Sequence, residues 1–296
     1  IALALKFLLV LTPYDKPQYR YTWATAAMLM SFIAPIITYI TIYQPDYSQA
    51  ANQAYDVAAM ISTQSLASNE TFIWYLEFFD ALPFVSMFWL VMVAVLASKL
   101  FIELYSVNQL PKIGVVEPDD ALNTRFIKLA QQVGLRKTPR LLISLKADIP
   151  MAIGWLKPVI LIPASMISGL APAQLDMLIL HELAHIRRHD YLVNFIQNLV
   201  ETLLFFHPCV RWISKQMRNE REYCSDDIAV QHCGNAIAYA HTLADTAALC
   251  TKKHNHTIPA MAMAASGGDL KQRVIRLVDG KVVSDTRKGE GTRQHV

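Results

Sequence analysis

The sequence has 296 residues, of which 53% are hydrophobic and only 17% are charged. An ordinary soluble domain carries about 25% charged residues, so this composition is typical of membrane segments joined to a more polar domain. The net charge of +3 is small, and no basic stripe carries interleaved aromatic residues, so we expect no nucleic-acid partner. The four cysteines form no CxxC pair and are expected to be free thiols in a reducing compartment.

Long apolar stretches occupy the first third of the chain. Residues 22–43 and residues 81–98 contain no charged side chain, and each stretch could cross a hydrocarbon core of about 30 Å as a helix. Residues 1–11 resemble the end of another membrane helix, and because the chain starts at Ile1 rather than Met we expect residues before it. These patterns predict a multi-pass membrane region over residues 1–110, with the lipid bilayer as a partner.

Basic residues are distributed unevenly around the apolar stretches. No lysine or arginine lies between Arg20 and Lys99, whereas several follow Lys99 closely. By the positive-inside rule, a loop at about residues 44–80 faces outward and the chain from Lys99 onward faces the cytoplasm. The sequence therefore predicts a protein of the bacterial inner membrane, with its polar domain on the cytoplasmic side.

Residues 111–280 have the pattern of a folded and mostly helical domain. Its first expected elements are an amphipathic helix, two strands and a helix that leads into a histidine motif: residues 118–133, 140–145, 158–163 and 172–185. The polar residues 281–296 read as a linker or tail. We expect an α+β fold in which membrane helices join a mostly helical domain with a small β-sheet.

The run His181-Glu182-Leu183-Ala184-His185 matches the HExxH pattern on a predicted helix. Side chains four residues apart lie on one helical face, so the two histidines can bind one Zn²⁺. Glu182 is then placed to act as the general base for a water that the metal activates. The apolar residues before the motif predict burial, and unpaired buried polar groups would cost about 1–3 kcal/mol each. This burial favours a metal site over two solvated histidines.

A catalytic zinc needs a third protein ligand, and His189 and Glu222 are the candidates. His189 continues the four-residue spacing, but a straight helix would carry it a full turn too far. A helical hairpin over residues 191–222, which turns at His207-Pro208, would return Glu222 to the level of the motif, because each arm is a little over ~20 Å long. We therefore predict Glu222 as the ligand.

Two aspartates are expected beside the zinc ligands. Asp226 lies one turn after Glu222 and is predicted to orient a zinc-binding histidine through its second nitrogen. Asp190 is expected to cap the first helix of the hairpin and to lie next to the ligands.

Other features leave their roles open. Zincin peptidases bind substrates as an added strand at a sheet edge, and Pro150–Gly154 is our candidate for that edge, with Gly154 permitting close approach of the substrate backbone. A plain turn between strands is the alternative interpretation. The sequence does not choose among four candidates for stabilising the transition state, which are His207, His232, His241 and Arg273.

Four runs of the sequence resemble the BlaR/MecR-type membrane metallopeptidases, which are related to the CAAX-prenyl and heat-shock membrane proteases. The runs are PMAIGWLKPVILIP, HELAHIRRHDYLVN, FFHP and RNEREYCSDDIA. The resemblance implies that zinc is held by His181, His185 and Glu222, and that Glu182 is the base. The family usually places cysteine directly before the aspartate, whereas Ser225 intervenes here, which puts a role for Cys224 in doubt.

Proteolysis in that family usually relays an external signal by cleaving a cytoplasmic regulator or the protease itself. The resemblance therefore implies a zinc endopeptidase in transmembrane signalling, of the antirepressor type. Some members carry a further span and a sensor domain after the zinc domain, and because neither is found here we expect a fragment. The alternatives are a non-proteolytic receptor with structural zinc and a quality-control protease. Glu182 disfavours the receptor, because a structural site needs no base and is usually closed by four ligands.

Overall fold

The structure is a computed structural model that describes residues 1–42, 70–154, 156–251 and 270–280. Most of the expected external loop and the expected tail at 281–296 lie outside the described residues. The chain forms two compact units. One unit combines residues 1–28 with the residues from 99 onward, and the other comprises residues 29–98. The unit that contains the expected zinc domain thus also includes the start of the chain.

Three helices carry the apolar stretches. They are α1 (Ala2–Leu11), α2 (Pro17–Ile42) and α4 (Glu70–Gln109), the last of which is followed by the 3₁₀ turn η1 (Leu110–Lys112). By length and composition, α2 and the interval Ala81–Lys112 could each cross a membrane. Pro35 lies inside α2 without ending it. Because α4 begins at Glu70, it extends into the interval that the sequence assigned to a loop.

Four short strands form one sheet in the order β1-β2-β4-β3. Their bounds are Val115–Val116, Arg140–Ser144, Met151–Ile153 and Val159–Pro163 for β1 to β4. β2 and β4 pair in parallel, and the aliphatic side chains of β4 are buried on both faces, as in other central parallel strands. β3 pairs antiparallel with β4 and is an edge strand, so residues 150–154 form a strand with flanking turns rather than a plain turn.

Helices cover this sheet and enclose the core of the unit. The helices that pack nearest to it are α5 (Asp120–Gln132), α6 (Ala164–Gly169) and α7 (Pro172–Arg187). Phe126 of α5, Ile160 of β4 and Leu183 of α7 are almost fully buried in one apolar cluster. The amphipathic helix and both strands predicted here are confirmed, with bounds that differ by one or two residues. The backbone of α7 is therefore anchored along its apolar face.

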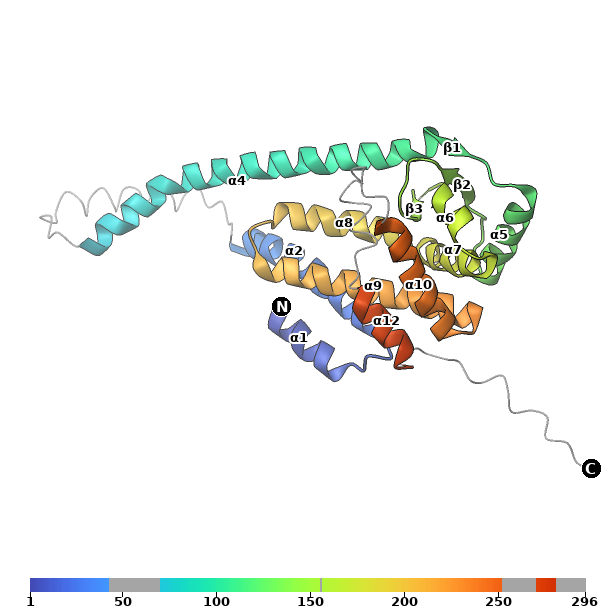
Figure 1. The fold of residues 1–296 in the computed structure, drawn as a ribbon. Helices are drawn as coiled ribbons and strands as arrows, with labels where there is room; N and C mark the ends of the chain where they lie inside the picture. The colour runs from blue at the N-terminus through green and yellow to red at the C-terminus, as the bar shows by residue number, and fades with distance from the viewer. Residues whose placement is uncertain (43–69, 155, 252–269, 281–296) are drawn as a thin grey trace, which may run out of the picture. The chain divides into compact units, whose positions relative to one another are not determined.

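A helical hairpin follows α7 and consists of α8 (Asp190–Leu203) and α9 (Pro208–Cys233), which run side by side in Figure 1. The sequence predicted Asp190 as the cap, but His189 occupies the cap position and has a left-handed backbone, with φ of 56°. The break therefore comes one residue earlier than predicted, and the Asp190 side chain does not cap the helix. Pro208 opens α9, since proline at the first helical position gives up no hydrogen bond.

Two further helices pack onto this part of the fold. α10 (Ala236–Thr251) contacts α6, α7 and α9, and α12 (Leu270–Val278) contacts α9 and α10. Both helices bring side chains to the region of α9 that carries Glu222.

A buried ion pair joins α2 to α9. Nε of Arg20 lies 2.7 Å from Oε1 of Glu220, and both side chains are at most 5% exposed. Arg20 also donates from Nη1 to the carbonyl oxygens of Leu9 and Thr12, at 2.6 and 2.9 Å. The end of α1 and the beginning of α2 are thus fastened to α9 two residues before Glu222.

Candidate active site

His181 and His185 lie on one face of α7, and Glu222 of α9 lies beside them. The Nε2 atoms of the two histidines are 3.1 Å apart. Oε2 of Glu222 is 3.5 Å from Nε2 of His181, and its Oε1 is 3.8 Å from Nε2 of His185. In a tetrahedral zinc site with bonds of about 2.0–2.2 Å, neighbouring ligand atoms are roughly 3.3–3.5 Å apart. The donor set and its spacing fit zinc.

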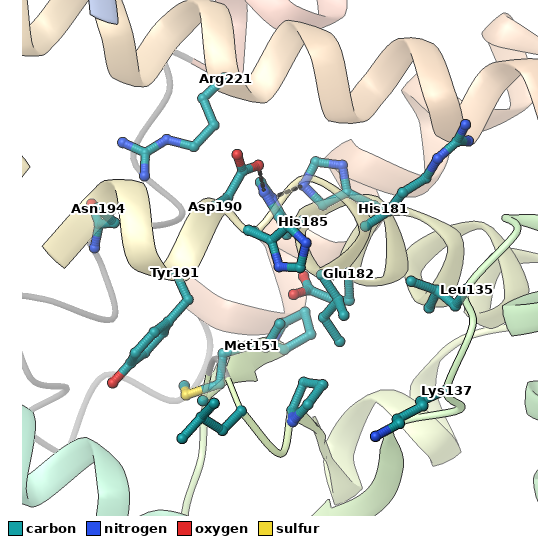
Figure 2. A pocket seen from close by; sticks show the side chains of 18 of the residues that line it. Leu135, Lys137, Met151, His181, Glu182, His185, Asp190, Tyr191, Asn194 and Arg221 are labelled. Atoms are coloured by element: carbon teal, nitrogen blue, oxygen red, sulfur yellow. Dashed lines mark hydrogen bonds and ion pairs between the residues drawn. The ribbon is translucent and has the colours of Figure 1, made fainter. Parts of the chain in front are cut away.

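Each of these histidines contacts an aspartate through its other ring nitrogen. Nδ1 of His185 lies 2.8 Å from Oδ2 of Asp190, as Figure 2 shows, and Nδ1 of His181 lies 3.2 Å from Oδ1 of Asp226. A carboxylate beside Nδ1 keeps the proton there and leaves the lone pair on Nε2. Both lone pairs then face the Glu222 carboxylate. These groups repel one another unless a proton on His181 or a metal ion lies among them.

Arg273 and Tyr239 surround Asp226. Arg273 of α12 donates from Nη2 and Nε to the two carboxylate oxygens of Asp226, at 2.6 and 2.8 Å. Its Nη1 lies 3.1 Å from Oε2 of Glu222. The hydroxyl of Tyr239, on α10, donates to Oδ1 of Asp226 at 2.7 Å and lies 2.9 Å from Nδ1 of His181. Two helices remote in sequence thus hold the carboxylates in place.

The charges of this cluster shift the pKa values of its members. Burial alone would raise the pKa of Glu222, but Arg273 and the two histidines lower it to about 2. Burial alone would lower the pKa of His181, but hydrogen bonds to Asp226 and Glu222 raise it to about 9. The pKa of Asp226 falls well below its usual range, because Arg273 outweighs the effect of burial. At neutral pH the metal-free site therefore holds ionised carboxylates and a protonated His181.

A cavity of about 540 Å³ opens beside the histidines. Glu182 lines this cavity from α7, and Met151 and Ala152 line it from β3, as Figure 2 shows in part. Glu182 is 7% exposed, so it reaches the cavity from a largely buried position. The cavity thus lies between the HExxH helix and an edge strand.

Pro150 and Gly154, at the two ends of β3, also line the cavity. Gly154 has a φ of 87°, and a Cβ atom there would lie 3.0 Å from the carbonyl oxygen of Lys157. Glycine is therefore required for the turn from β3 into β4. This reason differs from the one predicted from the sequence, which was that Gly154 permits close approach of a substrate backbone.

The remaining residues that the sequence singled out lie at different places relative to the cavity and the possible metal ligands. None of the four candidate transition-state stabilisers is among the described residues that line the cavity: His207, His232, His241 and Arg273. Arg273 is buried against Asp226 instead. His189 is exposed at the cavity wall, outside the group of three possible ligands. Burial raises the pKa of Cys224 to about 12, which disfavours the thiolate that metal binding requires.

The positions of several residues around this site were not predicted from the sequence. Tyr239 and Arg273 were not placed beside Asp226, and Tyr191 and Asn194 were not assigned to the cavity that they line. Asn194 did carry a signal, since it shares one polar face of α8 with Asp190 and Gln197, and all three side chains are buried. Nothing in the spacing of Tyr239 could have connected it to the motif.

Comparisons with known proteins show the family to which the chain belongs. The family model described as BlaR1 peptidase M56 matches residues 3–277. The regulatory protein BlaR1 of Bacillus licheniformis is 23% identical over 166 residues, which cover 55% of this chain and 26% of that protein. The methicillin resistance mecR1 protein of Staphylococcus aureus (strain Mu50 / ATCC 700699) is 23% identical over 129 residues, or 43% of this chain and 22% of that protein. The chain thus spans about a quarter of the length of these relatives. Because the family model covers nearly all of the sequence, this protein belongs to the BlaR1 peptidase M56 family.

Proposed function

We propose that this protein is a membrane-embedded zinc endopeptidase that hydrolyses peptide bonds of a cytoplasmic or membrane protein. The proposal rests mainly on the orientation of His181 and His185. Asp190 and Asp226 contact the Nδ1 atoms of these histidines, while both Nε2 atoms face Glu222. Three protein ligands leave one tetrahedral position open, as catalytic zinc sites require. The cavity at this position favours catalysis over a receptor with a closed structural site.

Zinc bound here would lower the pKa of a water toward about 7 and polarise the substrate carbonyl. Glu182 would accept a proton from the attacking water and pass it to the nitrogen of the leaving amine. The hydroxyl joins the carbonyl carbon as the C–N bond breaks, so one water is consumed for each bond cleaved. Asp190 and Asp226 would hold the histidine rings in orientation throughout.

The substrate would bind as an extended segment along β3. Within the described residues, β3 pairs with β4 on one side only, so its other edge offers backbone hydrogen bonds. Pro150 and Gly154 flank β3 at its two ends, and the cavity extends from β3 to Glu182. A peptide bond beside β3 would therefore lie within reach of the proposed base.

The proposed setting is the bacterial inner membrane. Residues 1–110 would form the membrane region, and residues 111–280 the cytoplasmic peptidase domain, because basic residues follow Lys99 and are absent from the interval before it. One relative is named a regulatory protein and another a methicillin resistance protein. These names support a role in transmembrane signalling, with a cytoplasmic regulator or the protein itself as the substrate.

Glu182→Gln tests the proposal. We expect this variant to keep zinc, because the ligands are unchanged, and to lose nearly all hydrolysis, because the base is absent. Metal content of the purified proteins is measured by mass spectrometry. Proteomes of cells that carry the wild type or the variant then reveal the substrate. Substantial cleavage by zinc-loaded Glu182→Gln would refute the catalytic assignment, and a zinc-loaded wild type that cleaves nothing would favour a non-proteolytic receptor.

A further inference from the structure

The cavity beside Glu182 carries basic side chains that the proposed chemistry does not use. Arg136 and Lys137, in the loop between α5 and β2, line it together with Arg187 at the end of α7. All three side chains are exposed, and the part of the chain that the structure describes contains no ion-pair partner for any of them. Their charge is therefore available to a ligand in the cavity.

Acidic residues do not balance this charge. Among the described residues that line the cavity, only Glu182 and Asp190 are acidic, and both belong to the proposed catalytic site. Asp190 already contacts Nδ1 of His185. The wall of the cavity outside the catalytic site is thus cationic or neutral, and bound zinc would add further positive charge.

Lys137 lies toward one end of the cavity, and Arg136 precedes it in the same loop. Figure 2 shows Leu135 and Lys137 on one side of Glu182, and Tyr191 and Asn194 on the other. Tyr191 and Asn194 are uncharged. Arg221 lies on their side, but it is only 2% exposed and donates from Nη2 to Oε1 of Gln197 at 2.6 Å. A peptide that runs along β3 would therefore place the residues on one side of its scissile bond near exposed cations. The residues on the other side would lie near neutral polar groups and a buried arginine.

We propose that this cleft selects protein segments that carry an acidic side chain on the Arg136–Lys137 side of the scissile bond. The inference rests on the proposed peptidase function and specifies its substrate class. A carboxylate within reach of an unpaired guanidinium or ammonium group forms a charge-assisted hydrogen bond, whereas a basic residue is repelled. Since the cations are exposed, the preference acts mainly on KM and weakens as salt increases.

The test uses the full chain, purified in detergent and loaded with zinc. A peptide library prepared from a digested proteome is cleaved, and the cleavage sites are mapped by mass spectrometry. We expect aspartate and glutamate to be enriched on one side of the scissile bond only. For a peptide from that profile, replacing both Arg136 and Lys137 by alanine should lower kcat/KM about tenfold, mostly through KM. Lys137→Glu should shift the preference toward lysine and arginine.

Lys128→Ala is the matched control, because Lys128 is an exposed lysine of α5 outside the cavity wall. Its cleavage profile should equal that of the wild type. If the wild type cleaves without an acidic preference, or if the double variant keeps that preference, the inference is wrong while the peptidase function stands. A double variant that loses only its binding to vesicles of anionic lipid, with an unchanged profile, would identify the patch as a lipid contact and overturn the inference. Absence of any cleavage by the zinc-loaded wild type would refute both proposals.

Discussion

Oδ2 of Asp190 lies 2.8 Å from Nδ1 of His185, although the two residues belong to different helices. The left-handed backbone of His189 makes this contact possible, because it ends α7 and redirects the chain within two residues. A residue that begins one helix therefore orients a proposed zinc ligand on the helix before it. The angle between α7 and α8 and the geometry of the metal site are consequently coupled.

This contact predicts the effect of Asp190→Ala. Loss of a carboxylate that orients a metal-binding histidine usually weakens metal affinity by about 10–100-fold. We expect a loss of this size, measured by competition with a zinc chelator. Asp176→Ala is the control, since Asp176 lies on α7 but forms a partly exposed ion pair with Arg125. Equal zinc affinities for the two variants would show that Asp190 does not support the metal site.

The third ligand is tested by comparing Glu222→Ala with His189→Ala. Glu222 lies beside both motif histidines, whereas His189 is exposed at the cavity wall. We expect Glu222→Ala to lose its metal during purification, and His189→Ala to retain close to one zinc per chain. Mass spectrometry of the purified variants measures both. A zinc-free His189→Ala variant beside a zinc-loaded Glu222→Ala variant would reverse the assignment.

Zinc binding should release a proton near neutral pH. The pKa of His181 in the metal-free site is about 9, so this ring must lose a proton to bind metal, whereas Glu222, with a pKa of about 2, is already ionised. Zinc affinity should therefore rise up to about tenfold per pH unit until pH approaches 9. Titration calorimetry in buffers of different ionisation enthalpy counts the protons released. Asp226→Asn should release fewer, because the pKa of His181 falls without that carboxylate.

The raised pKa of His181 also predicts that the stability of the zinc-free protein decreases as pH rises, whereas zinc affinity increases. The folded-state pKa of His181 is raised from 6.5 to about 9, so its contribution is fully present below pH 6.5 and is lost as pH rises through 9. Thermal unfolding of the metal-free protein should therefore shift to lower temperature over this interval. A midpoint that rises between pH 7 and 9 would contradict the assignment of His181 as protonated.

Tyr239→Phe should weaken zinc binding without unfolding the protein. The change removes a hydroxyl that contacts both Asp226 and His181 and leaves the ring packed in the core. We expect a loss of about tenfold in zinc affinity, at the lower end of the usual range for such partners. Tyr223→Phe is the control, because the Tyr223 hydroxyl bonds Gln272 instead. If both variants bind zinc like the wild type, the Tyr239 hydroxyl does not orient the site.

The sequence predicts the parts of this site that depend on regular helix geometry. The four-residue spacing brings His181 and His185 together, and the lengths of two helices bring Glu222 back to them. Tyr239 and Arg273 could not be predicted, because α10 and α12 reach the site only through tertiary packing. The helix break was misplaced by one residue, since a left-handed backbone at a residue other than glycine, such as His189, leaves only a weak sequence signal.

The ion pair between Arg20 and Glu220 determines which fragments of this protein can be made. A fragment that began at Lys99 would retain α9 but leave the Glu220 carboxylate buried without its cation. Removing one partner of a buried ion pair costs about 3–5 kcal/mol, which approaches the whole stability of many domains. The first 28 residues are part of the compact unit that contains the HExxH helix. Biochemical work on the residues from Lys99 onward therefore has to keep α1 and the beginning of α2 in every preparation.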